Sequence, residues 1–548
     1  EMINLNRYIF FDFIKPKISQ TQYGFVFIPF IGALIVGPII YKFAHEAKGH
    51  GVPEVMDAIN RKNSMIRKRV AFVKIVVSSI TIGSGGSAGR EGPIAQIGSS
   101  VGSGVGQVLK LQDRYVKLLT VSGLSAGIAS TFNAPLGGAL FGMEVLLGGF
   151  EAIDAVPIIL ACVVGTAIAT SYLGYHTAFR EVDFVFRPAE LPYYLVLGFI
   201  CGIFAVLFVH FFYKFEDFFD KLKIPSYLKP SIGGLLTGVV GFSFVSFGIM
   251  GVGYEGIEMA LFGKLALKLL LILFILKIVA TSLTIGSGSS GGVFAPSLYI
   301  GAMLGGFLGT VFSMFDSSIR PEAYVLLGMG AFFAAVGKAP LTCMVMIPEM
   351  SGDYRMIAPL MASIILSYAV SSMFLGKSSI YTLKLERKGV YKPHPPILEE
   401  FENIKVRDIM TPNPVTVSPE MPISKVFDYI ARHKKLGYPV MHGGKVVGLL
   451  SFNRIRYYNK PLENLKVKNL MLHPPTVTPE TSVYEVFEKL TDKEGGRVCV
   501  VENGRLVGIV TKTDILKAYN IAKKILEDEE RLSTEIRKRL KKLVGRIT

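Results

Sequence analysis

The sequence contains no tryptophan, only four cysteines and few charged residues. Charged residues make up 18% of the 548 positions and hydrophobic residues 50%, a balance that excludes a chain made only of soluble domains. Without tryptophan, tyrosine and phenylalanine must supply any aromatic belt at a membrane interface. The cysteines are scattered without disulfide or metal-site spacing, so we expect buried thiols at Cys162, Cys201, Cys343 and Cys499.

Long apolar runs occupy residues 22–376, and several, such as 23–41 and 267–285, could cross a bilayer. Buried helices of a soluble protein are the alternative, but so many runs in one chain favour a multi-pass membrane protein. The net charge of +17 gathers in short basic segments such as 60–69 and 384–392. The positive-inside rule places these segments in the cytoplasm, and no nucleic-acid partner is needed to explain them.

The apolar part repeats itself. Residues 81–98 align with 284–301, and residues 126–145 align with 331–350. Glycine-interrupted segments at matching places in two halves are typical of transporters whose substrate site lies at the repeat interface.

Three segments share a glycine–proline pattern: GHGVP (49–53), GREGP (89–93) and GVFAP (292–296). Non-helical backbone within a membrane must be buried in protein or line a wet cavity. Glycine permits unusual backbone angles, and proline suits the first turn of a new helix. Helix N-termini carry free N–H groups and partial positive charge, so three that converge would bind an anion. Close helix packing by small residues is the alternative.

Glu91 is a carboxylate inside the second of these segments. An intramembrane carboxylate indicates a functional site. At a helix N-terminus it would be stabilised as an anion, could occupy the place of the transported ion, and would swing out when protonated. The alternative is an ion pair with Arg90, although neighbouring side chains on an extended turn point apart.

With these motifs, residues 22–385 resemble the CLC family of chloride channels and chloride/proton antiporters. The resemblance implies an all-α polytopic membrane fold with two inverted repeats and broken helices, followed by an α/β cytoplasmic pair of CBS domains. It also implies a homodimer in the cell membrane, in contact with lipid, with one chloride or related anion pathway per subunit. In the family one long helix precedes the span near Tyr23, which suggests that most of that helix is truncated here.

The resemblance assigns residues to the pathway. Glu91 matches the gating glutamate, and Tyr381 in KSSIYTLKL matches a tyrosine whose hydroxyl contacts the central ion. Backbone N–H groups of the second and third segments would line the anion sites, namely those of Arg90, Glu91, Gly92, Val293, Phe294 and Ala295.

Two positions depart from the family pattern. His50 stands where a serine often binds the central anion; its imidazole N–H could donate to an anion, or the ring could turn away. Val145 stands where antiporters usually have a glutamate and pure channels commonly have valine, while the adjacent Glu144 resembles a structural glutamate. We therefore expect a voltage- or pH-gated chloride channel or an uncoupled conductance, with chloride/proton antiport as the alternative.

The polar C-terminal region contains a second repeat, in which residues 406–430 align with 467–490. The copies resemble a pair of CBS domains. The resemblance implies a site for an adenine nucleotide (ATP, ADP or AMP), with the Thr511 hydroxyl and the Asp514 carboxylate on the ribose. Arg454 replaces the acid in the first copy, and a dimerising module without a ligand is the alternative.

These patterns predict five regions along the chain. They are a membrane domain at 1–384, a linker at 385–404, CBS repeats at 405–460 and 461–520, and a basic helical tail at 521–548.

Two other functions fit less well. A CBS-regulated divalent-cation transporter would require Asp or Glu clusters within the membrane. A membrane-embedded enzyme would require a P-loop or a positioned base and nucleophile, and the sequence shows neither. We therefore expect no enzyme activity, no metal site and no required cofactor.

Overall fold

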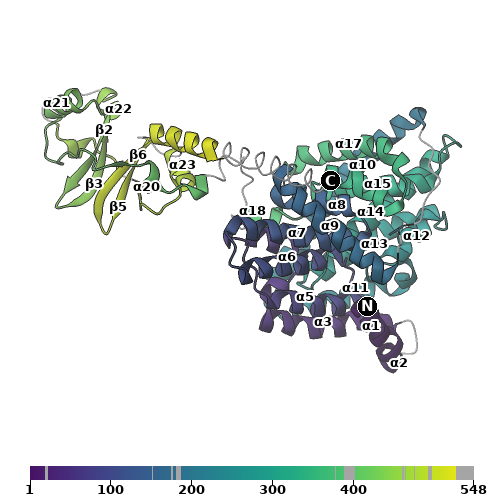
Figure 1. Ribbon diagram of the computed structural model, residues 1–548. Coiled ribbons are helices and arrows are strands. Elements are labelled where there is room, and N and C mark those ends of the chain that lie inside the picture. Colours follow the sequence, from purple (N-terminus) through teal and green to yellow (C-terminus); the bar gives the residue numbers. More distant parts are fainter. Residues whose placement is uncertain are drawn as a thin grey trace, which may run out of the picture. The chain divides into compact units, whose positions relative to one another are not determined.

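The structure is a computed structural model that describes residues 1–18, 23–150, 152–174, 177–179, 187–376, 378–387, 401–458, 462, 465–473, 475–491 and 496–525. The chain divides into two compact units, Glu1–Lys392 and Pro393–Thr548. The first is built from helices, and the second combines small sheets with helices (Figure 1).

The predicted linker and tail lie mostly outside the described residues. Residues 385–387 belong to helix α18 (Leu383–Arg387), and residues 388–400 are not described. The last described helix covers residues 512–525 and so includes only the start of the predicted tail.

Seven helical segments among the described residues are long and apolar enough to cross a membrane, as the hydrophobic runs predict. They are Gly24–Phe43, Asp154–Leu173, Pro188–Lys221, Lys229–Phe247, Leu267–Gly286, Phe294–Ser313 and Tyr354–Leu375.

The helices of the first half return in the same order in the second. The first half contains α3 (Gly24–Phe43), α4 (Val52–Arg61), α5 (Arg69–Gly83), α6 (Glu91–Val108), α7 (Asp113–Phe132), α8 (Pro135–Phe141) and α9 (Ala152–Leu173). The second half contains α11 (Lys229–Gly241), α12 (Tyr254–Leu261), α13 (Leu267–Gly286), α14 (Phe294–Ser313), α15 (Pro321–Gly337), α16 (Pro340–Ser351) and α17 (Ile357–Leu375).

Shorter elements and one long helix complete this unit. The long helix α10 (Leu191–Lys221) joins the halves. The others are α1 (Met2–Arg7), α2 (Lys15–Ile18), the π-helical turns η1 (Tyr8–Ile14) and η3 (Gly142–Leu147), and the 3₁₀ turns η2 (His45–Ala47), η4 (Pro188–Glu190), η5 (Phe242–Phe247) and η6 (Tyr354–Met356).

A reciprocal pair of carboxylates shows that the halves run in opposite directions. Glu144, just after α8, accepts hydrogen bonds from the N–H groups of Leu341 (3.1 Å) and Thr342 (2.8 Å) at the start of α16. Glu349, near the end of α16, accepts from the N–H groups of Leu136 and Gly137 at the start of α8, at 3.1 and 2.7 Å. Each helix therefore ends where the other begins, as an inverted repeat requires.

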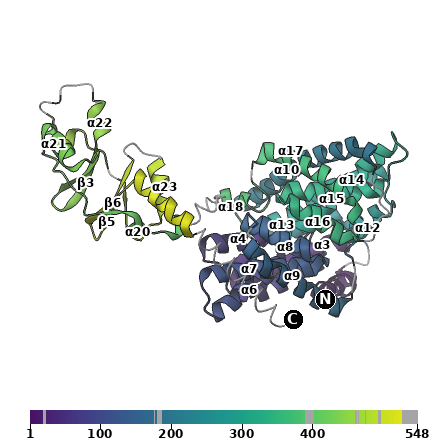
Figure 2. The ribbon, with the colours of Figure 1, turned by 45° about the horizontal axis from the view of Figure 1, so that its top comes forward.

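Close glycine contacts hold the equivalent helix pairs α6–α7 and α14–α15 together. A Cβ added to Gly98 would lie 2.1 Å from the carbonyl oxygen of Gly123. In the other half, a Cβ on Gly301 would lie 2.4 Å from the carbonyl oxygen of Gly328. Small residues thus allow backbone to approach backbone, which is how helices associate in lipid. Figure 2 shows α6, α7, α8 and α9 lying together, and likewise α14, α15 and α16.

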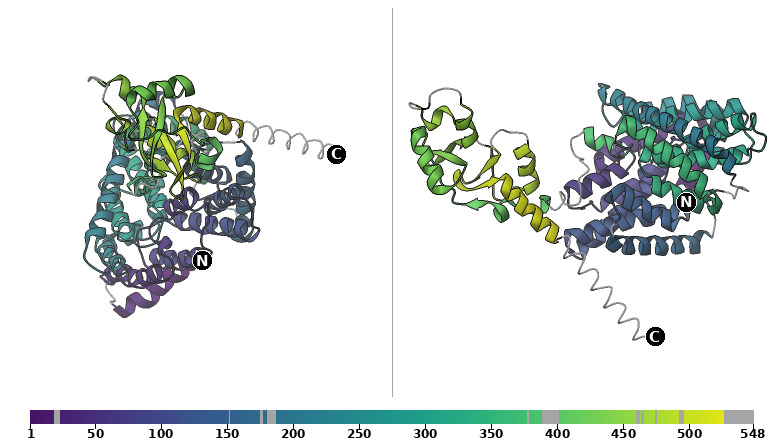
Figure 3. Two further views of the ribbon diagram at one scale, coloured as in Figure 1. Left: turned by 90° about the vertical axis from the view of Figure 1, so that its left-hand side faces the viewer. Right: turned by 90° about the horizontal axis from the view of Figure 1, so that it is seen from above.

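The second unit contains two small sheets, seen from further sides in Figure 3. Strands β2 (Gly437–His442) and β3 (Lys445–Ser451) form one sheet; β1 (Thr411–Pro412), β6 (Arg505–Thr511), β5 (Arg497–Glu502) and β4 (Thr476–Val477) form the other in that order. The helical elements are α20 (Val406–Ile409), α21 (Ile423–His433), α22 (Phe452–Arg456), η7 (Val467–Asn469), α23 (Val483–Thr491) and the segment 512–525.

Each repeat of this unit completes the sheet of the other. Thr411 of the first repeat pairs with Ile509 of the second, and Leu472 of the second pairs with Leu449 of the first. The hairpins β2–β3 and β5–β6 even carry a bulge at the same place, after Val440 and after Val500. The duplicated unit therefore buries its edges against its own copy.

The four cysteines are free and buried, as expected. Burial raises the pKa of the Cys499 thiol to about 12, so this sulfur stays protonated at neutral pH.

Candidate anion site

The three glycine–proline segments meet in the middle of the first unit. Gly89 and Gly292 exchange two backbone hydrogen bonds, of 2.8 and 2.6 Å. The N–H of Gly49 donates to the carbonyl of Ser289 at 3.1 Å, and the N–H of Gly291 donates back to Gly49 at 3.3 Å. Backbone that has left its helices is therefore satisfied by the other broken segments, as burial in a membrane demands.

Each segment begins a helix with proline in the first turn. The helix α4 starts at Val52 with Pro53, α6 at Glu91 with Pro93, and α14 at Phe294 with Pro296. Gly49 and Gly51 have φ values of 73° and 86°, where glycine avoids strain. The N-termini of α6 and α14 thus point free N–H groups at a shared region.

The carboxylate of Glu91 lies at the start of α14. The side chain is buried, and it accepts a hydrogen bond from the Tyr254 hydroxyl (2.7 Å) and one from the N–H of Ala295 (3.4 Å). The guanidinium of Arg90 lies over the ring of Tyr254, 5.5 Å from its centre. A carboxyl group therefore already occupies the N-terminus of α14.

His50 and Tyr381 lie together on another side of the site. Their ring centres are 5.8 Å apart, and both side chains are buried. Neither ring nitrogen of His50 has a hydrogen-bond partner among the described residues. The ring of Tyr381 also packs edge-on against Phe141, at 6.1 Å.

The residues of the third segment are buried too. Val293, Phe294 and Ala295 are at most 3% exposed, and the Phe294 ring lies 4.2 Å from that of Phe333. Gly92 lies against the first segment, because a Cβ there would be 2.2 Å from the carbonyl oxygen of His50. The structure therefore brings the predicted pathway residues together.

Two buried lysines outside the recognised motifs hold the backbone that leads into α4 and into its counterpart α12. The Lys74 ammonium on α5 donates to the carbonyls of Ala47 (3.0 Å) and Gly49 (2.9 Å). Lys277 on α13 donates to those of Gly248 (2.7 Å) and Gly251 (3.1 Å). The signal was present in the sequence, because 81–98 and 284–301 extend backwards to align these lysines.

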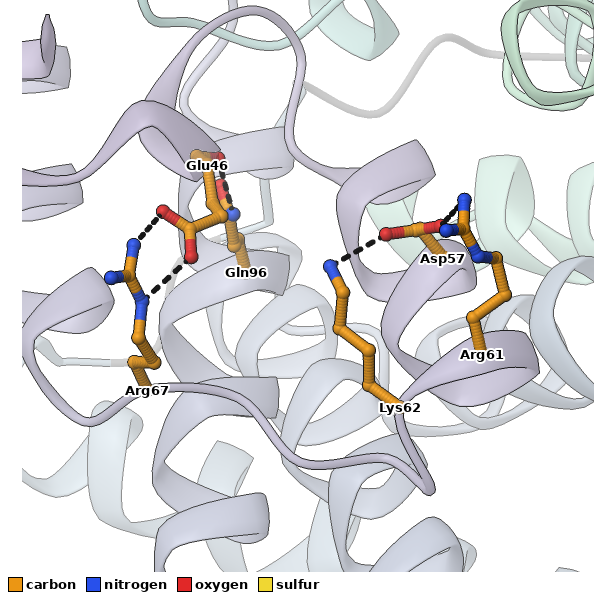
Figure 4. Close-up of polar contacts among 6 residues, drawn as sticks. All are labelled: Glu46, Asp57, Arg61, Lys62, Arg67 and Gln96. Atoms are coloured by element: carbon orange, nitrogen blue, oxygen red, sulfur yellow. Dashed lines mark hydrogen bonds and ion pairs between the residues drawn. The ribbon is translucent and has the colours of Figure 1, made fainter. Parts of the chain in front are cut away.

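Glu46, which lies just before the first glycine–proline segment, is also held by hydrogen bonds. Gln96 on α6 donates to its backbone carbonyl at 2.7 Å, and the guanidinium of Arg67 grips its carboxylate with two hydrogen bonds (Figure 4). Asp57 pairs with Lys62 nearby in the same view. The backbone that carries His50 is therefore held in place by three different elements.

The predicted inner relay position carries no free carboxylate. Val145 lies in η3 and is buried. Besides its two backbone donors, Glu144 accepts from the Thr342 hydroxyl at 2.7 Å. Three donors thus hold Glu144 at the start of α16, which agrees with the structural role expected for it.

A separate cavity of about 730 Å³ lies between the repeats of the second unit. Its lining includes Ser451, Arg454 and Tyr457 of the first repeat and Arg497, Thr511 and Lys512 of the second. Asp514 lies behind this lining and accepts hydrogen bonds from the Thr511 N–H (2.9 Å), the Thr511 hydroxyl (2.7 Å) and Lys517 (2.7 Å). The predicted nucleotide pair therefore sits together, beside a cavity of ligand size.

These features define a polytopic membrane protein whose site is built from helix N-termini. A family model described as voltage gated chloride channel matches residues 32–372, and the CBS domain model matches residues 406–459 and 467–521. The chain belongs to the CLC family and carries a C-terminal CBS pair, as the motifs indicated. This is a family of transport proteins and not of enzymes.

Named relatives and solved structures agree with this assignment. The chain is 31% identical over 507 residues to "Chloride channel protein CLC-f" of Arabidopsis thaliana, covering 81% of this chain and 63% of that one. It is 32% identical over 359 residues to "H(+)/Cl(-) exchange transporter ClcA" of Yersinia pseudotuberculosis, covering 64% and 74%. The chain thus spans less than two thirds of its Arabidopsis relative.

Two solved structures share the fold. A slow cyanobacterial Cl⁻/H⁺ antiporter matches with a TM-score of 0.63 at 24% identity, covering 71% of this chain and 92% of the other. A eukaryotic CLC transporter matches with a TM-score of 0.61 at 22% identity, covering 94% and 93%.

Proposed function

We propose that this chain carries chloride across a membrane in exchange for protons, with Glu91 as the gate. The observation that carries the proposal is the Glu91 carboxylate at the N-terminus of α14, where it accepts from the Ala295 N–H. A carboxylate that takes the place of the transported anion can leave it when protonated, which links the two ions at one group. Chloride would then bind the N–H groups of Arg90, Glu91, Gly92, Val293, Phe294 and Ala295, with His50 and Tyr381 beside it.

We propose chloride/proton exchange in place of the channel function that Val145 favours. Relatives that include a named chloride/proton exchanger support exchange. A buried Glu91 whose hydrogen-bond partners are a hydroxyl and a backbone N–H also supports it, because neither of these donors is a cation that holds the carboxylate in its charged form. We further propose a homodimer in the cell membrane, with the CBS pair in the cytoplasm.

Coupled flux from liposomes tests the exchange. Purified protein in chloride-loaded liposomes should release chloride and take up protons together, even against a proton gradient, because one group serves both ions. Chloride and pH electrodes in the same cell record both. Chloride release without proton movement would favour a channel, and no chloride release would contradict the chloride assignment.

We also propose that the CBS cavity binds an adenine nucleotide. Three cationic side chains line it, from Arg454, Arg497 and Lys512, and these favour a phosphate. The Thr511 hydroxyl, next to Asp514, would contact the ribose.

Nucleotide titrations on the full chain should separate these contacts. Thr511→Val should weaken AMP, ATP and adenosine alike by about tenfold, because each loses a hydrogen bond. Arg454→Gln should weaken AMP and ATP but not adenosine, because only the phosphate loses a partner. Lys489→Gln on α23, which removes a charge paired with Glu485, is the matched control. Calorimetry that detects none of the three ligands would favour the ligand-free module.

A further inference from the structure

His50 is a buried imidazole whose polar atoms make no hydrogen bond to the described residues. It is 3% exposed, and both ring nitrogens lack a partner among the described residues. A neutral imidazole always carries one N–H donor and one acceptor, and a buried polar group left unpaired destabilises the folded state. The fold nevertheless keeps the ring in place: Lys74 and Gln96 bind the backbone carbonyls of Gly49 and Glu46, and the ring packs against Phe212 and Tyr381. Such a group indicates a ligand position.

The charges around His50 favour an anion as that ligand. Lys74 on α5 binds the carbonyl of Gly49, and the Lys384 ammonium on α18 lies 3.8 Å from where a Cβ on Gly49 would be. Lys384 is itself paired with Glu216 of α10 at 3.1 Å. Two ammonium groups oppose a positive imidazole in an empty site, and an anion beside the ring offsets them. The other titratable groups around this region include Glu54 on α4, Lys48 with its partner Asp220 on α10, Tyr381, Glu91, and Cys343 on α16.

On the inner side of the pathway, η3 offers no carboxylate that is available to carry a proton. Position 145 is valine, and all the hydrogen bonds of Glu144 described above go to the start of α16. The ring of His50, by contrast, lies 5.8 Å from that of Tyr381, and the partly exposed Lys384–Glu216 pair lies beside the adjacent Gly49. Imidazole is the side chain whose charge changes most readily near neutral pH.

We propose that His50 takes up a proton together with the bound anion and passes protons between Glu91 and the inner side of the pathway. This inference rests on the proposed exchange function and supplies the step for which position 145 offers no carboxylate. The O–H bond of protonated Glu91 breaks, and its proton adds to a ring nitrogen of His50 through bridging water. The imidazolium then releases a proton to water beside the Lys384–Glu216 pair, which regenerates neutral His50.

A chloride-binding experiment on protein that lacks the Glu91 carboxylate measures proton uptake by His50 separately from proton uptake by the gate. Chloride added to Glu91→Ala protein, in weakly buffered detergent at about pH 6.5, should cause proton uptake, because the anion favours the imidazolium. The double variant Glu91→Ala/His50→Ser should take up none, whereas Glu91→Ala/His45→Ser should behave as its parent, since His45 is exposed on η2. Uptake that survives His50→Ser, or that is missing from the parent, would overturn the proposal.

Flux measurements then test the transport step. The ratio of protons to chloride should fall by about a hundredfold in His50→Ser relative to wild type, as loss of a proton-transfer group predicts. A carboxylate added nearby, in His50→Ser/Val145→Glu, should restore part of the ratio. An unchanged ratio in His50→Ser, with wild type exchanging both ions, would overturn the inference alone. Wild type that passes no chloride would instead overturn the proposed function.

Discussion

Glu91→Ala should abolish proton movement while chloride still flows. The wild-type carboxylate sits at the start of α14, hydrogen-bonded to Ala295 and Tyr254. Alanine leaves that N-terminus open to the transported anion and removes the group that carries the proton. The expected loss of proton flux is about a hundredfold, at the lower end of what a positioned acid–base group contributes.

The liposome assay with both electrodes measures this result directly. Glu255→Gln is a matched control, because Glu255 follows Tyr254 in the chain but pairs with Arg7 at the surface. That variant should keep the wild-type ratio of protons to chloride. Proton movement that persists in Glu91→Ala would show that the gate lies elsewhere.

Gly92→Ala should eliminate chloride transport and weaken the fold. A methyl group at this position would lie 2.2 Å from the His50 carbonyl oxygen and 2.9 Å from the Cα of Gly292. Both neighbours are backbone, so neither can rotate away. Overpacking of this kind costs about 1–3 kcal/mol or more, and here the strain falls where all three broken segments meet.

Flux and thermal unfolding in detergent together check the Gly92 prediction. Gly149→Ala is the control, because a Cβ at Gly149 would meet no atom within 4 Å. It should leave both readings as in wild type. Wild-type flux in Gly92→Ala would mean that the segments pack less tightly than the structure indicates.

Much of the fold follows from local sequence patterns. Long apolar runs require membrane helices, since their backbone groups must be satisfied within the helix. A glycine followed four residues later by a proline predicts the helix starts at Glu91 and Phe294, because glycine permits the turn before a helix and proline suits its first turn. The alignment of 406–430 with 467–490 likewise predicts two copies that complete each other, as the Thr411–Ile509 and Leu472–Leu449 pairings confirm.

The contacts of the site depend on residues far apart in the sequence. Tyr254 and Glu91 are 163 positions apart and share a hydrogen bond, yet the tyrosine belongs to none of the recognised motifs. Lys74 and Lys277 read as ordinary basic residues within apolar runs until the carbonyls they bind are visible. Neither motif nor spacing shows which hydrogen-bond partners a buried charge will find.

The sequence by itself therefore determined the class of protein, the membrane helices, the three helix starts and the duplicated CBS region, because these depend on hydrophobicity, backbone freedom and repetition along the chain. Only the tertiary structure decided the antiparallel course of the halves, the engagement of Glu144 with α16, the position of Glu91 at α14 and the unpaired nitrogens of His50. Each of these is a contact between distant segments, and its geometry exists only once the helices have packed.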